Sequence, residues 1–125
     1  MPQILIVDDS EEFRHMLRNV LQTAGYDVQD APNGKAALEL YRQHPFDLVI
    51  TDLIMPEKEG LETIVEFRRI HQAVKIIAIS GGDRINAANN LAMAQKLGAD
   101  RTLPKPFSPD EILNIVAQLL GGPKD

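Results

Sequence analysis

The sequence has no cysteine and no tryptophan, and aromatic residues make up only 5% of it. Without cysteine there is no disulfide framework, no thiolate metal site and no catalytic thiol. No apolar run is longer than four residues, which is far too short to span a bilayer. The opening Met-Pro-Gln lacks the basic lead and small-residue cleavage site of a secretory signal. We therefore expect a cytoplasmic protein with no membrane partner.

An excess of positive charge is also lacking, because the net charge is −5. General nucleic-acid binding needs grouped Lys and Arg to neutralise phosphates, so no direct nucleic-acid partner is expected. The three histidines, His15, His44 and His71, are scattered without metal-ligand spacing and are predicted to lie on the surface.

The 125 residues, 44% hydrophobic and 25% charged, have the size and balance of one globular domain. We expect a single domain over residues 1–125, with a core from about 3 to 120 and a flexible tail at 121–125.

Short apolar segments alternate with longer stretches of helical spacing. Strands are predicted at Ile4–Val7, Tyr26–Gln29, Leu48–Thr51, Lys75–Ser80 and around Thr102–Leu103. Helices are predicted from about 13 to 24, 34 to 44, 58 to 71 and 84 to 97, and after the capping box that begins at Ser108. Five strand–helix repeats predict an α/β fold, in which helices cover both faces of one parallel sheet.

Polar side chains follow four of these strands at their carboxyl ends. Asp8 and Asp9 follow the first, Asp52 follows the third, Ser80 ends the fourth and Lys105 follows the fifth. Because ligands of open α/β sheets bind at this edge, we expect the five side chains to meet there.

Three carboxylates at one edge repel each other, at roughly 4 kcal/mol per close pair. A hard divalent cation removes this cost, and a small oxygen-only site suits Mg²⁺ better than Ca²⁺. Lys105 and Ser80 would complete a cradle for a phosphoryl group. Taken singly, each residue has a plainer reading: Asp9 and Ser10 could cap the first helix, and Ser80 could belong to an ordinary loop.

The motifs together resemble the receiver domain of two-component response regulators. They are Asp8-Asp9, Asp52 followed by Met55-Pro56 and Gly60, Ser80, and Lys105-Pro106-Phe107. The resemblance covers about residues 3 to 120. It implies a flavodoxin-like fold, with five parallel strands in the order 2-1-3-4-5 and five helices.

The resemblance also implies roles for single residues. Asp52 would accept a phosphoryl group from a histidine kinase or a histidine phosphotransfer protein. Asp8, Asp9, Asp52 and the backbone carbonyl of Ile54 would hold Mg²⁺, with Mn²⁺ as an alternative.

Further residues would recognise the transferred group and pass on the signal. Ser80, Gly81 and Lys105 would bind the phosphoryl group, and Pro106 is a candidate for a cis peptide bond. The fourth helix, fifth strand and fifth helix would present the output face to an unknown protein target. The chain would thus be a regulatory phosphoacceptor rather than an enzyme, with its output through protein contact.

Two departures from the family pattern affect switching. Thr102 stands where many receivers have an aromatic residue, so that form of coupling should be weak or replaced. Ile54 and Gly82, which flank the path of an attacking water, cannot orient it, and we expect slow loss of the phosphoryl group. Two other functions stay open: constitutive docking without a phosphorylation response, and a Mg²⁺-dependent phosphohydrolase, which would need a carboxylate where Ile54 stands.

Overall fold

The fold is a parallel sheet between two layers of helices. The computed structural model describes residues 2–52, 59–71, 73–80, 92, 95–96 and 98–121. Five strands pair in the order β2-β1-β3-β4-β5, and every pairing is parallel. The strands are β1 (Gln3–Val7), β2 (Asp27–Ala31), β3 (Leu48–Asp52), β4 (Lys75–Ser80) and β5 (Arg101–Pro104). The predicted fold class and strand order are therefore confirmed.

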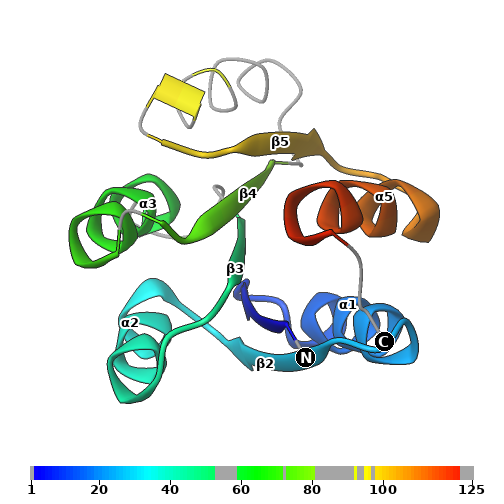
Figure 1. Cartoon of the computed structure of the whole chain (residues 1–125), viewed down its shortest axis with the longest axis horizontal. Coiled ribbons are helices and arrows are strands. Elements are labelled where there is room, and N and C mark those ends of the chain that lie inside the picture. The colour runs from blue at the N-terminus through cyan, green and yellow to red at the C-terminus, as the bar shows by residue number, and fades with distance from the viewer. Residues whose placement is uncertain are drawn as a thin grey trace.

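Four helices lie in the described part of the chain. They are α1 (Glu11–Thr23), α2 (Gly34–Gln43), α3 (Glu59–Ile70) and α5 (Pro109–Leu120). As Figure 1 shows, α1 and α5 cover one face of the sheet, and α2 and α3 cover the other. The predicted fourth helix, 84–97, falls mostly outside the described residues. No helix within the described ranges is long and apolar enough to cross a membrane.

The central strands are apolar on both faces because each face is covered by helices. Along β1, Leu5 and Val7 pack with residues of α2 and α3, including Phe67. Ile4 and Ile6, which alternate with them, pack with residues of α1 and α5. Burying these side chains stabilises the fold by roughly 1.5–3 kcal/mol each, so the core holds the strand ends in fixed positions.

Side-chain caps fix where the helices begin. The Ser10 hydroxyl accepts a hydrogen bond from the Phe13 amide at the start of α1, and the Asn33 side chain accepts one from Ala36 at the start of α2. The predicted capping box at Ser108 and Glu111 is present at α5. Because α1 and α5 begin just after the carboxyl ends of β1 and β5, their caps also shape the edge where the predicted site lies.

Two sequence expectations need correction. Strand β2 begins one residue later than predicted and continues to Ala31. The expectation of three surface histidines holds fully for His15 alone, because His44 and His71 are half-buried. The His44 Nε2 lies 3.2 Å from the Gln29 side-chain nitrogen, and the His71 Nδ1 lies 2.5 Å from the Tyr41 hydroxyl.

Candidate functional site

Two buried aspartates end neighbouring strands at the centre of the sheet. Asp8 directly follows Val7 of β1, and Asp52 is the last residue of β3. The register pairs Val7 with Thr51, which brings the two aspartates together. Asp8 is 1% exposed and Asp52 5% exposed, so neither carboxylate can rely on water to stabilise its charge.

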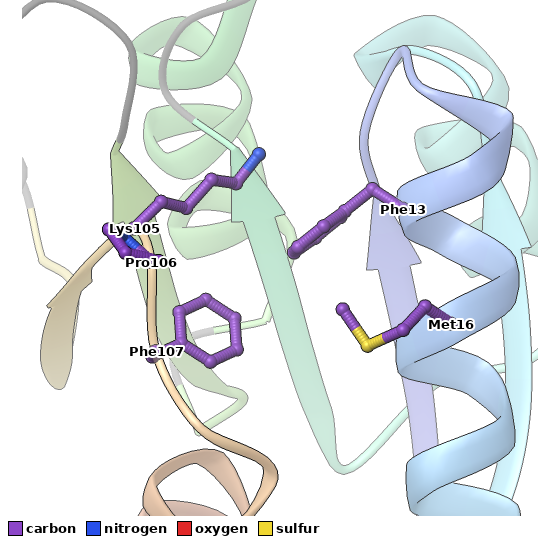
Figure 2. A pocket seen from close by; sticks show the side chains of 5 residues that line it. All are labelled: Phe13, Met16, Lys105, Pro106 and Phe107. Atoms are coloured by element: carbon purple, nitrogen blue, oxygen red, sulfur yellow. The ribbon is translucent and has the colours of Figure 1, made fainter.

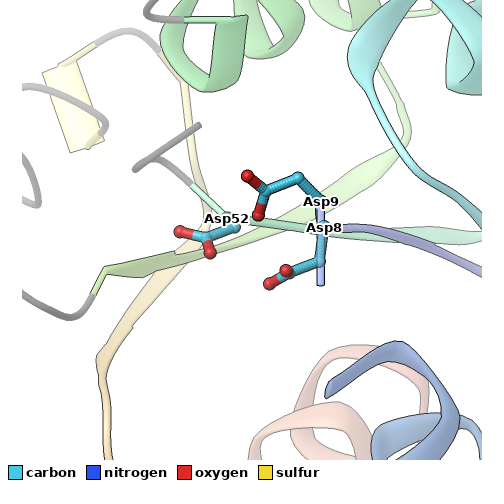
Figure 3. Close-up of side chains that lie close together, drawn as sticks. All are labelled: Asp8, Asp9 and Asp52. Carbon is cyan, nitrogen blue, oxygen red and sulfur yellow. The ribbon is translucent and has the colours of Figure 1, made fainter. Parts of the chain in front are cut away.

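Asp9 completes an acidic cluster at this edge, and its side chain is exposed. Figure 3 shows the three carboxylates of Asp8, Asp9 and Asp52 grouped beyond the ends of the strands. One oxygen from each lies within 4.8 Å of the others. Three carboxylate oxygens at this spacing could hold a hard metal ion.

Lys105 supplies a positive charge to the two buried carboxylates. Its Nζ lies 3.1 Å from an Asp52 oxygen and 3.3 Å from an Asp8 oxygen. The lysine side chain is 27% exposed, so it reaches the buried pair from the rim of the site. The Lys105–Pro106 peptide bond that follows is cis.

Asp8 is held at four polar atoms. The Ser10 amide donates to Oδ1 at 2.8 Å, and Lys105 donates to Oδ2. The Asp8 amide donates to the Ala31 carbonyl, and the Asp8 carbonyl accepts from Arg14 Nη1 at 2.7 Å. Burial raises the pKa of Asp8 above its ordinary value of 3.8, and the neighbouring Asp52 carboxylate raises it further; the Ser10 amide and Lys105 act in the opposite direction.

An apolar pocket of about 260 Å³ borders the lysine, between α1 and the segment that joins β5 to α5. Figure 2 shows its lining: Phe13 and Met16 from α1, and Lys105, Pro106 and Phe107 from the joining segment. The Phe13 and Phe107 rings meet edge to face with centroids 6.0 Å apart. The Lys105 ammonium lies 4.0 Å from the centroid of the Phe13 ring, so an aromatic face bounds the charged site on this side.

The structure thus brings together four of the predicted site residues: Asp8, Asp9, Asp52 and Lys105. Ser80 ends β4 in register with Pro104, and Thr102 lies half-buried on β5 in register with Ala78. The predicted positions Ile54, Gly81 and Gly82 lie outside the described residues.

Sequence reasoning missed two residues that contact this site. Phe13 and Arg14 were predicted to lie in the first helix, and neither was given a role at the site. Their contacts depend on how α1 turns as it leaves the sheet, which a single sequence does not specify. The only signal is their place on the helix that follows Asp8-Asp9, five and six residues after Asp8.

Comparison with known proteins identifies the family. The model of the response regulator receiver domain matches residues 4–117. The chain is a response regulator receiver domain. Its sequence is 32% identical over 118 residues to the chemotaxis protein CheY of Halobacterium salinarum, covering 94% of this chain and 96% of that protein.

Other relatives of this receiver domain are longer. It is 35% identical over 120 residues to the transcriptional regulatory protein CpxR of Klebsiella pneumoniae. This match covers 96% of the present chain but only 50% of that regulator. Among solved structures, the response regulator protein TrrA of Thermotoga maritima, in complex with Mg²⁺ and BeF, superposes with a TM-score of 0.82. It is 34% identical, over 95% of this chain and 99% of TrrA. The receiver domain therefore belongs to two-component systems.

Proposed function

We propose that this receiver domain is a Mg²⁺-dependent phosphoacceptor switch, with Asp52 as the residue that accepts the phosphoryl group. The observation that carries the proposal is the position of Lys105, whose ammonium bridges the buried Asp8 and Asp52 carboxylates. Lys105, together with a metal ion held by the acidic cluster, would compensate the negative charge that a phosphoryl group adds at Asp52.

The donor set fits a bound Mg²⁺. Asp8, Asp9 and Asp52 offer only oxygen ligands, which are those that Mg²⁺ prefers. Ile54, through its carbonyl, is proposed as a further ligand. When bound, the ion would neutralise charge on the phosphoryl oxygens during transfer. Mn²⁺ has a similar ligand preference and would be the simplest substitute.

The proposed transfer uses the Asp52 carboxylate as the nucleophile. One of its oxygens attacks the phosphorus of a phosphohistidine, so that an O–P bond forms and the N–P bond breaks. The electron pair of the broken bond returns to the donor imidazole, which takes up a proton from solvent. Lys105 is close enough to turn toward the new charge, and Ser80 and Gly81 are proposed as further contacts to it.

The natural donor would be a histidine kinase or a histidine phosphotransfer protein, and the domain would work in the cytoplasm. Phosphorylation adds nearly two negative charges at Asp52, and this shifts the populations of conformations that a partner distinguishes. The output face would be formed by the predicted fourth helix (84–97), β5 and α5. With Thr102 at the aromatic position, we expect a modest shift of these populations. Residues 1–125 would act as one domain, either alone like CheY or within a longer regulator.

A phosphorylation assay with intact-mass detection tests the proposal. Wild type incubated with acetyl phosphate and Mg²⁺ should gain one phosphoryl group, and chelation of the metal or Asp52→Asn should abolish the gain. Asp27→Asn, which changes an exposed aspartate at the opposite end of β2, is the matched control and should behave as wild type. An adduct that survives in Asp52→Asn would contradict the role of Asp52. If folded wild type gains no phosphoryl group, the proposal is wrong and constitutive docking becomes the better explanation. Turnover of external phosphate esters would instead favour a phosphohydrolase.

A further inference from the structure

Arg14 on α1 joins the backbone of the acidic site to the neighbouring strand. Its Nη1 donates to the Asp8 carbonyl at 2.7 Å, and its Nε donates to Asp30 Oδ2 on β2, also at 2.7 Å. The Arg14 and Asp30 side chains are only 13% and 14% exposed. We propose that Arg14, oriented by Asp30, is a positioning residue that fixes Asp8 for cation binding. This inference rests on the metal site of the proposed function.

The position of Asp8 in the chain explains why its backbone needs such a partner. Asp8 lies just beyond the last residue of β1, where the regular pairing with the neighbouring strands stops. Its amide still donates to the Ala31 carbonyl of β2 at 3.2 Å. Its carbonyl is instead satisfied by Arg14, which is itself paired with the residue before Ala31. Both backbone groups of Asp8 are thereby tied to the end of β2.

The planar guanidinium suits this double contact. Nε and Nη1 point in fixed, different directions, so one side chain can hold a carbonyl and a carboxylate together. A lysine amine at this position keeps the charge but lacks the two N–H donors in fixed, different directions. Replacing Arg14 by lysine therefore separates the positioning effect from the effect of a nearby positive charge.

Arg18 provides an internal control for the same ion cluster. Its Nη1 pairs with the other Asp30 oxygen at 3.0 Å, and its side chain is 41% exposed. Within the described residues, the Asp8 carbonyl accepts a hydrogen bond from Arg14 and not from Arg18. Removing Arg18 thus takes away one positive charge and one Asp30 contact but leaves the Asp8 carbonyl bonded.

A misplaced ligand weakens a metal site even when the ligand itself is unchanged. Partners that orient metal ligands typically contribute 10–100-fold to affinity. Asp8 has its side chain fixed by Ser10 and Lys105, so freeing its backbone should disturb but not abolish the site. We therefore expect a loss near the lower end of that range when Arg14 is removed.

Mg²⁺ titration of the purified protein, followed by the backbone amide NMR signals, tests this inference. Arg14→Gln should raise the dissociation constant for Mg²⁺ about tenfold. Arg14→Lys should give a smaller but clear increase, and Arg18→Gln should stay close to wild type. Equal losses in Arg14→Gln and Arg18→Gln would overturn the inference, because charge alone would then account for both. Wild-type affinity in Arg14→Lys would overturn it for the same reason.

A second readout needs no metal. The Ser10 amide donates to Asp8 Oδ1, so its hydrogen exchange reports the position of the Asp8 side chain. Exchange at Ser10 should accelerate in Arg14→Gln and not in Arg18→Gln, at equal global stability. If wild type binds no Mg²⁺, the metal part of the proposed function fails. The Arg14 inference is then tested by hydrogen exchange alone, and Ser10 exchange that is unchanged in Arg14→Gln would overturn it. If Arg14→Gln does not fold, Arg14→Lys is compared with Arg18→Gln in both experiments, and identical behaviour would overturn it.

Discussion

The Lys105 ammonium lies between the face of the Phe13 ring, 4.0 Å from its centroid, and the Asp8 and Asp52 carboxylates. The ring quadrupole attracts a cation in this position, and partial burial strengthens the attraction. Phe13 belongs to α1, whereas Lys105 follows β5. The ring therefore connects α1 directly to the charged centre of the site.

Energetic coupling between Phe13 and Lys105 is the first prediction. In a double-mutant cycle with Phe13→Leu and Lys105→Met, the coupling energy should be about 0.5–2 kcal/mol, since both variants keep apolar volume but remove the cation–π contact. Chemical denaturation of the metal-free protein measures it. Met16→Ala, at another residue that lines the same pocket, is the control and should show little coupling to Lys105. Coupling within error for the Phe13 pair would contradict the prediction.

Stabilisation by Mg²⁺ is the second prediction. An ion that binds only the folded state should raise the free energy of unfolding by about 2.7 kcal/mol at one hundred times its dissociation constant. Asp9→Asn should greatly reduce this increase, although Asp9 is exposed and its loss should change the metal-free stability little. Thermal denaturation with Mg²⁺ and with chelator measures the difference. Asp27→Asn should retain the full increase; the same increase in Asp9→Asn would argue against a site at the acidic cluster.

The pH dependence of stability is the third prediction, and it follows from Asp8. Burial raises the pKa of Asp8 in the folded state above its ordinary value of 3.8, so the fold binds this proton more tightly than the unfolded chain does. The contribution of Asp8 to stability must therefore fall as the pH rises from the unfolded pKa through the folded one.

Asp8→Asn keeps an oxygen that can accept from Ser10 but carries no charge to bury. Relative to wild type, the metal-free variant should gain stability as the pH rises from about 4 to about 7. Urea denaturation in the presence of chelator, repeated across this range, measures the change. A stability difference that stays constant across the range would show that the charge of Asp8 is fully compensated in the fold.

The acidic cluster could be predicted from sequence because one rule governs it. Apolar segments buried on both faces run parallel, and the residues after them share an edge of the sheet. This rule brought Asp8, Asp52 and Lys105 together without knowledge of side-chain positions. It applies best to central strands, where hydrophobicity marks both the strand and its end.

The rule works less well for a strand at the edge of the sheet. The predicted strand ended at Gln29, before the polar Asp30, but β2 continues to Ala31. It lies at the edge of the sheet beside β1, and Asp30 compensates its charge with Arg14 and Arg18. The ion pairs that make this strand end possible depend on which side of α1 faces β2. Such contacts between long side chains depend on how the elements pack, and the local sequence pattern does not determine them.

Arg68 is the basis of the last prediction, because it joins three segments at the amino edge of the sheet. From α3 it donates to the carbonyls of Val74, just before β4, and of Gly98. It also pairs at 2.7 Å with Asp100, whose carboxylate accepts from the Ile76 amide of β4. The Val74 and Gly98 carbonyl contacts are partly buried, so both carbonyls lose their hydrogen-bond donor if the guanidinium is removed.

Arg68→Met preserves most of the apolar stem and should lower the free energy of unfolding by about 2–4 kcal/mol. Arg69→Met is the matched control: Arg69 is 73% exposed and pairs with Glu66 on the same helix, so its loss should cost less than about 0.5 kcal/mol. Urea denaturation of both variants measures the costs. The proposed site lies at the opposite, carboxyl edge, so folded Arg68→Met should still accept a phosphoryl group. Equal costs for the two arginines would mean that the Arg68 contacts contribute no more than a surface pair.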